Sequence, residues 1–157
     1  MNGQNDLLIL AIGNPARGDD GLGPQFLCEL KKQNIESPHF RWSYQLNIED
    51  AEQFSHFKKI LIVDAQKDGD LPFNFETVLP SETCHFSSHI LLPQNVLALT
   101  VYLYNKQPEV YLLAITGSDF HFSEQLSTLA HANLLQAVNY IILKFPEFQT
   151  SRLTSMS

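Results

Sequence analysis

The sequence contains only two cysteines, Cys28 and Cys84, and they do not form a CxxC pair. Their number and spacing argue against a structural zinc site and against a small secreted domain held together by disulfides. The sequence also lacks a basic stretch followed by an apolar run and a cleavage site near its start. Its apolar runs, such as Leu7–Ile12, are far too short to span a bilayer. We therefore expect a cytoplasmic protein with no membrane partner.

Positive charge is scarce: ten Lys and Arg residues stand against 17 Asp and Glu residues, a net charge of −7. Such a surface repels nucleic acid and anionic lipid, so neither is expected as a partner. With 157 residues, 44% of them hydrophobic, the chain is long enough for one globular domain. We expect a flexible head at residues 1–6, one domain at residues 7–146 and a flexible tail at residues 147–157. A monomer or weak oligomer is expected.

Short apolar runs and alternating segments predict five strands. Three runs are continuously apolar and are expected to be buried on both faces: Leu7–Ile12, Lys59–Asp64 and Glu109–Ile115. Two segments alternate, and the second is expected at a sheet edge: Phe40–Leu46 and Phe73–Leu79.

Four segments between or after these strands have the residue patterns of helices. The predicted helices are Gly23–Lys32, a short helix capped by Asn47 with Asp50 as partner, a helix starting at Pro93, and a long helix from a Ser123 cap to about Phe145. Alternating strands and helices indicate a single-domain, three-layer α/β/α fold around a mostly parallel twisted sheet.

In such a sheet, functional groups gather outside the carboxyl ends of the strands. Asp19 and Asp20 lie in the Gly13–Gly23 loop after the first strand, and Asp64 ends the third. A phosphate-binding loop is rejected because the Lys-Ser/Thr pair is missing and two carboxylates would repel phosphate. A simpler explanation remains open, in which either aspartate caps the following helix.

If Asp20, Asp64 and His89 converge, they form a mixed oxygen and nitrogen ligand set. That set suits a borderline divalent ion such as nickel or zinc, with positions left for water or substrate. Without metal, repulsion between the two carboxylates is expected to raise the pKa of one of them. Taken singly, a histidine or an acid at a strand end is more often structural.

The segment Leu10–Pro24 resembles the opening motif of the hydrogenase maturation proteases. The resemblance runs from about Leu7 to about Phe145. Ala16 and the Lys67–Phe75 stretch, which lacks a Pro-Gly pair, depart from the family pattern without removing a ligand. Further matches follow in family order: Gln45-Leu46 with Glu49, Ile60–Ala65, Ser87-Ser88-His89, and Ile115–Phe120 with Ser123 and Leu126-Ser127.

The resemblance implies an endopeptidase that removes the C-terminal extension of a nickel–iron hydrogenase large-subunit precursor after nickel insertion. It implies that Asp20, Asp64 and His89 bind nickel carried by the substrate and act in catalysis, whereas Asp19 is not a ligand. Two alternatives stay open: a noncatalytic nickel-sensing chaperone of the precursor, or a peptidase of the same fold with another protein substrate. A serine or cysteine mechanism is disfavoured because no nucleophile elbow is present and Cys28 is expected to face the core.

For the remaining polar residues of the loop, and for the other histidines, we expect structural or surface positions. Asn14 is expected to fix the turn with its side-chain amide. Arg17 is expected to be solvated, with orienting Asp20 or meeting a substrate carboxylate as alternatives. The other histidines lack metal-ligand spacing and are expected at the surface or in caps: His39, His56, His85, His121 and His131.

Overall fold

The computed structural model describes residues 6–35, 39–82 and 91–148. Its sheet has five strands in the order β2-β1-β3-β5-β4. Only β4 runs antiparallel to its neighbour, which confirms the prediction of a mostly parallel sheet. The strands are β1 (Leu7–Ile12), β2 (His39–Ser43), β3 (Lys59–Gln66), β4 (Phe73–Val78) and β5 (Glu109–Thr116).

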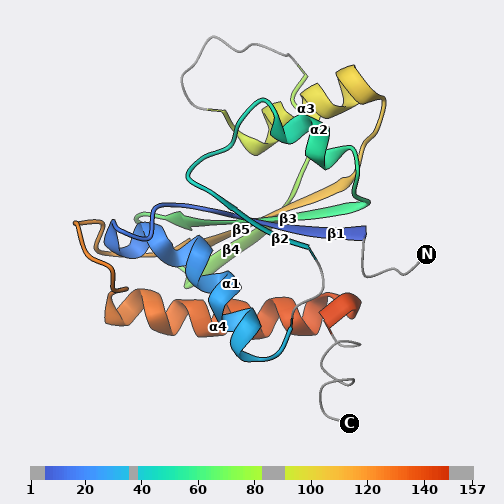
Figure 1. The fold of residues 1–157 in the computed structure, drawn as a ribbon. Helices are drawn as coiled ribbons and strands as arrows, with labels where there is room; N and C mark the ends of the chain where they lie inside the picture. Colours follow the sequence, from blue (N-terminus) through green and yellow to red (C-terminus); the bar gives the residue numbers. More distant parts are fainter. Residues whose placement is uncertain (1–5, 36–38, 83–90, 149–157) are drawn as a thin grey trace.

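Helices cover both faces of this sheet and complete the predicted three layers (Figure 1). The α1 and α4 helices lie on one face, and α2 and α3 lie on the other. The helical elements are the 3₁₀ turn η2 (Gly18–Gly21), α1 (Leu22–Lys32), α2 (Asp50–Phe54), α3 (Pro93–Tyr104) and α4 (Thr128–Lys144). Pro93 begins α3 as predicted, because a residue in the first helical turn needs no hydrogen-bonded N–H.

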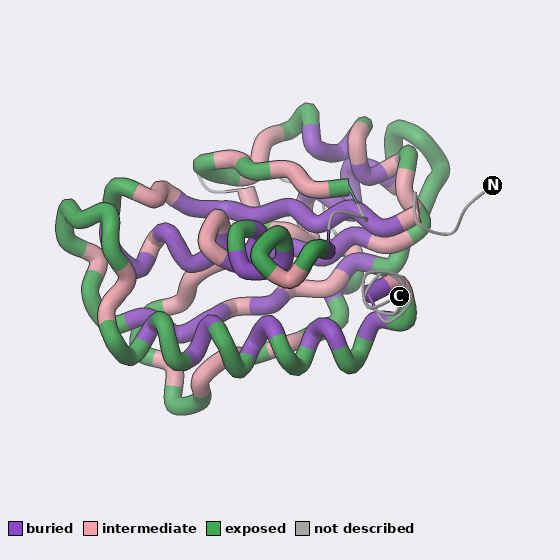
Figure 2. The backbone as a smooth tube through the Cα atoms, turned by 60° about the horizontal axis from the view of Figure 1, so that its bottom comes forward, coloured by how far each residue is buried: buried purple, intermediate pink, exposed green. Residues whose placement is uncertain are grey.

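The two faces of the sheet have separate hydrophobic cores, because successive side chains of a strand point to opposite sides. In β1, Leu7 and Ile9 pack in the core under α1 and α4, whereas Leu8 and Leu10 pack in the core under α2 and α3. The β1 strand is therefore buried along its whole length, and β3 is buried from Ile60 to Val63 (Figure 2). Phe148 is also fully buried in the first core, so the packed chain extends at least to this residue.

Several element boundaries differ from the predictions because tertiary contacts decide them. The β2 strand ends at Ser43 rather than Leu46. The β3 strand continues past Asp64 because its pairing with β5 extends to Gln66 opposite Thr116.

The caps of two helices were also predicted wrongly. Ser127, not Ser123, caps α4, and its hydroxyl accepts the N–H of Ala130 at 3.1 Å. Asn47 does not cap α2 through its side chain. Asp50 instead accepts the backbone N–H of Asn47 at 2.7 Å, which is one half of the expected reciprocal pair.

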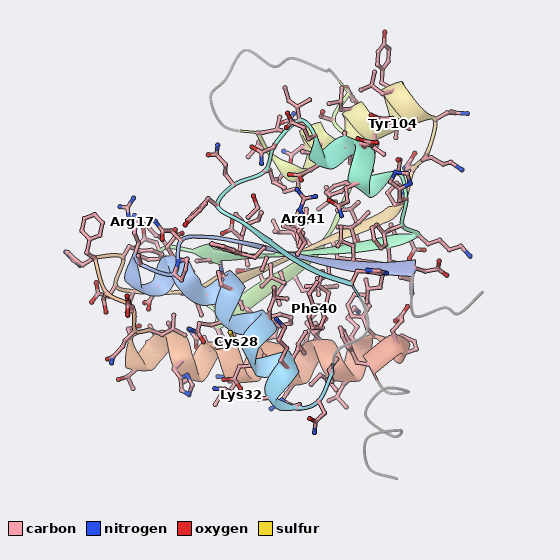
Figure 3. The ribbon with its side chains drawn as sticks, viewed as in Figure 1. Arg17, Cys28, Lys32, Phe40, Arg41 and Tyr104 are labelled. Atoms are coloured by element: carbon pink, nitrogen blue, oxygen red, sulfur yellow. The ribbon has the colours of Figure 1, made fainter. Side chains whose placement is uncertain are left out.

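Cys28 lies on α1, as expected (Figure 3). Its side chain is exposed, so the prediction that it faces the core is wrong. Among the described residues, the longest helices remain too short or too polar to cross a membrane.

Candidate functional site

The turn after β1 is held in a conformation that requires glycine. Gly13 has φ of +141°, and a Cβ atom there would lie 2.0 Å from the backbone oxygen of Asp20. The Asn14 side-chain oxygen accepts the N–H of Ala16 at 2.9 Å, which confirms the predicted role of Asn14. The indole N–H of Trp42 donates to the Gly13 carbonyl at 2.8 Å. These contacts fix the path of the chain just before its two aspartates.

Asp19 is completely buried and bonds to the loop that follows β5. Its carboxylate accepts backbone N–H groups from Ser118 at 2.7 Å, Asp119 at 2.8 Å and Ser127 at 2.7 Å. The Ser127 hydroxyl adds a fourth bond at 2.7 Å. Neither η2 nor α1 has a side-chain cap, so the helix-capping explanation of the acid pair is wrong. Asp19 instead joins two loops that are distant in sequence.

The hydrogen bonds of Asp19 decide its charge. Burial raises the pKa of this carboxyl, but the bonds from the Ser127 side chain and from the three backbone N–H groups outweigh burial. The net pKa lies below its usual value, so Asp19 is ionised and fully engaged at neutral pH.

Asp20 lines a cavity of about 360 Å³ together with Asp64. Asp20 accepts the N–H of Asn14 at 2.8 Å, and Asp64 accepts the N–H of Ala65 at 2.8 Å. Each carboxylate therefore has one backbone donor, which leaves lone pairs on both residues for a ligand. The structure thus brings together two of the three predicted ligands at the carboxyl ends of β1 and β3.

The Asp64 carboxyl group has a pKa raised to about 6. Burial is the largest cause, the N–H of Ala65 opposes it, and the charge of Asp20 adds to it. The predicted repulsion between the two acids therefore contributes, although burial contributes more. A cation between them would relieve both effects.

The third predicted ligand, His89, lies outside the described residues, as does His85. Leu91 and Leu92, the first described residues after this gap, line the same cavity. Asn95 holds this end of the segment because its side-chain oxygen accepts the N–H of Leu92 at 3.0 Å. Within the described ranges, no three His, Cys, Asp or Glu side chains are grouped to hold a metal. The roles of Asp20, Asp64 and His89 stay predictions.

One wall of the cavity comes from residues that the sequence did not predict at the site. Tyr44, Gln45 and Leu46 line it, although only the last two had been noticed, and then by resemblance. A parallel sheet could have indicated this wall, because β2 is parallel to β1 and its carboxyl end therefore reaches the same edge. The prediction of a strand extending to Leu46 placed these residues within the sheet, whereas β2 ends at Ser43.

The comparisons with known proteins concern the whole fold. No protein-family model and no curated protein matches the sequence. Solved structures do match, among them the hydrogenase maturating endopeptidase HybD from E. coli, with a TM-score of 0.66 and 15% identity over 87% of this chain and 90% of that one. The chain has a maturation-protease fold.

Two further solved structures have the same fold as this chain. The [NiFe] hydrogenase maturation protease HycI from Thermococcus kodakarensis has a TM-score of 0.65 and 19% identity over 94% of this chain and 95% of that one. The hydrogenase 2 maturation peptidase from Thaumarchaeota archaeon SCGC_AB-539-E09 has a TM-score of 0.63 and 18% identity over 88% and 97%. The maturation-protease fold therefore accounts for nearly the whole described chain.

Proposed function

We propose that this protein is a cytoplasmic endopeptidase that removes the C-terminal extension of a nickel–iron hydrogenase large-subunit precursor. The observation that carries the proposal is the shared cavity of Asp20 and Asp64 at the carboxyl edge of the sheet. The maturation-protease fold of the chain supports the reaction class. The motif around Asp20 supports the substrate class.

Nickel is part of the substrate in this proposal. Asp20, Asp64 and His89 complete the coordination of an ion already seated in the precursor, so a precursor without nickel is not recognised. The raised pKa of Asp64 supports a cation here, because a positive ion offsets the cost of holding two nearby carboxylates ionised. Carboxylate and imidazole donors suit nickel.

The ion positions the adjacent peptide bond in the cavity. Water adds to the carbonyl carbon, the C–N bond breaks, and the released amine takes up a proton. Two routes to the attacking water fit the arrangement: the ion lowers the pKa of the water, or a carboxylate accepts its proton.

Purified protein incubated with nickel-loaded and nickel-free precursor tests the proposal, with products weighed by mass spectrometry. Loss of a C-terminal peptide is expected only from the nickel-loaded precursor. Asp20→Asn, Asp64→Asn and His89→Ala are each expected to abolish the loss. Asp70→Asn, at an exposed position outside the cavity, is the matched control and is expected to cleave normally.

The same experiment separates the alternatives. Nickel-dependent binding without a change of mass would identify a noncatalytic chaperone. Normal cleavage of both precursors would refute recognition through nickel. Neither binding nor cleavage would indicate that the substrate is a different protein.

A further inference from the structure

A second cavity, of about 470 Å³, lies at the carboxyl edge of the sheet, lined partly by the same two segments. Arg17, three residues before Asp20, lines it, and so does Lys67, three residues after Asp64. Figure 3 shows Arg17 at the end of the molecule where the loops after β1 and β5 meet. The other lining residues are Asp68, Gly117, Ser118, Phe120 and His121.

The two basic side chains of this cavity rest against aromatic rings rather than carboxylates. The Arg17 guanidinium lies 5.8 Å from the centre of the Phe122 ring, and the Lys67 ammonium lies 4.8 Å from that of Phe120. Such contacts orient a cation without neutralising it. Within the described part of the chain, neither side chain lies within 4.0 Å of a carboxylate.

Two acids beside the cavity have hydrogen-bond partners of their own. Asp19 is buried behind the cavity wall and accepts four hydrogen bonds. Asp119 lies 2.6 Å from the His121 ring, and this contact is the largest cause of its lowered pKa. Asp68 is the one acidic residue among those that line the cavity. The residues that line the cavity therefore carry two positive charges against one negative charge, on a protein of net charge −7.

The wall of the cavity is tightly packed. A Cβ atom on Gly117 would lie 2.6 Å from the Asp19 Cβ and 3.1 Å from the Phe120 ring. Because Asp19 binds the N–H groups of Ser118 and Asp119, this wall is attached to the turn that carries Asp20. The position of the second cavity relative to the cavity of Asp20 and Asp64 is thus fixed by the Asp19 hydrogen bonds.

We propose that this second cavity binds a carboxylate of the protein substrate between Arg17 and Lys67 while the cleaved bond lies at Asp20 and Asp64. The inference rests on the proposed endopeptidase function. A carboxylate is the anion that a peptide supplies, either as its terminal group or as an Asp or Glu side chain. Charge attraction at a site remote from the reacting bond holds the substrate in register.

Steady-state cleavage of the nickel-loaded precursor tests the inference in wild type, Arg17→Gln and Lys67→Gln. Each neutral variant is expected to raise KM about three- to tenfold with kcat within about twofold, because the lost contact acts equally on bound substrate and transition state. Asp68→Asn is expected to lower KM, because it removes the opposing charge. These effects are expected to shrink at high salt.

Conservative and remote variants control for structural damage. Arg17→Lys and Lys67→Arg keep the charge but change the shape of the head group, and each is expected to raise KM less than the matching Gln variant does. Lys106→Gln removes one positive charge at the opposite end of β5 and is expected to leave KM unchanged. A rise in KM with Lys106→Gln equal to that with Arg17→Gln would overturn the inference, because overall charge would then explain both.

Two modified precursors identify the source of the carboxylate. A precursor ending in a C-terminal amide is expected to lose sensitivity to Lys67→Gln if the terminal group binds. A precursor in which Asn and Gln replace the Asp and Glu residues of the extension is expected to lose sensitivity to Lys67→Gln if an acidic side chain binds. Normal cleavage with unchanged KM in both Gln variants would overturn the inference and leave the proposed function standing, whereas no cleavage by wild type would refute both.

Discussion

Ser127 donates both its backbone N–H and its hydroxyl to the Asp19 carboxylate, each at 2.7 Å. The same hydroxyl accepts the N–H of Ala130 and so caps α4. One buried carboxylate thereby fixes the start of the last helix and the turn that presents Asp20. Asp19 is a structural residue, and its neighbour is the residue that faces the cavity.

Asp19→Asn is expected to lower the free energy of unfolding by about 2–4 kcal/mol, because an amide cannot accept all four hydrogen bonds and its NH₂ would face donors. Urea unfolding at pH 7 measures the change. Asp20→Asn is the matched control and is expected to cost less than about 1 kcal/mol, since its side-chain oxygen can still accept the Asn14 N–H. Equal losses in both variants would contradict the separation of roles.

The difference in free energy of unfolding between wild type and Asp19→Asn is expected to depend on pH, because the pKa of Asp19 changes on folding. The pKa of Asp19 is lower in the folded protein than its ordinary value of 3.8. Its stabilisation is therefore fully present above the unfolded pKa and disappears as the pH falls through the folded value. Wild type and Asp19→Asn are expected to converge in stability in acid.

Asp64→Asn is expected to stabilise the protein at alkaline pH. The pKa of Asp64 is about 6 in the folded protein against an ordinary 3.8. The contribution of this carboxyl group to stability is therefore fully present below pH 3.8 and is lost as the pH rises through 6. After allowance for partial exposure to solvent, we expect a gain of about 1–2 kcal/mol at pH 8. Urea unfolding at pH 8 and pH 4 measures it, and a gain that persists at pH 4 would refute the electrostatic explanation.

Gly23→Ala is expected to destabilise the fold by about 2–4 kcal/mol or to prevent folding. A Cβ atom at this position would lie 2.3 Å from the Ile12 carbonyl oxygen and 2.8 Å from that of Val63. These are backbone atoms of the two central strands, so they cannot move aside easily. Thermal unfolding followed by circular dichroism measures the change, and a melting temperature equal to that of wild type would show that α1 packs less closely than described.

The only tryptophan, Trp42, is expected to report ligand binding by its fluorescence. Its indole donates to Gly13, and Gly13 lines the cavity of Asp20 and Asp64. Titration with Ni²⁺ is expected to quench this fluorescence, and Asp20→Asn is expected to weaken the apparent affinity at least about tenfold by removing a charged ligand. Quenching that is identical in the variant would place the ion elsewhere.

Much of the fold could be predicted because it depends on local patterns. Continuous apolar runs predicted β1, β3 and β5 within two residues, and Pro93 marked the first turn of α3. The wrong prediction of the α4 cap concerns a residue whose partner is remote in sequence. Ser123 and Ser127 have similar capping ability, and only the position of Asp19 selects Ser127.

The sequence by itself determined the layered α/β architecture and the edge at which Asp20 and Asp64 gather, because apolar runs are local and their alternation with helices along the chain predicts parallel strands. Only the tertiary structure shows why Asp20, which the resemblance had assigned as the ligand, lines the cavity while Asp19 does not. Adjacent side chains of a 3₁₀ turn point in different directions, and the direction of each depends on what packs against the turn. Here the loop after β5 supplies four donors to Asp19, and Asp20 is left facing Asp64.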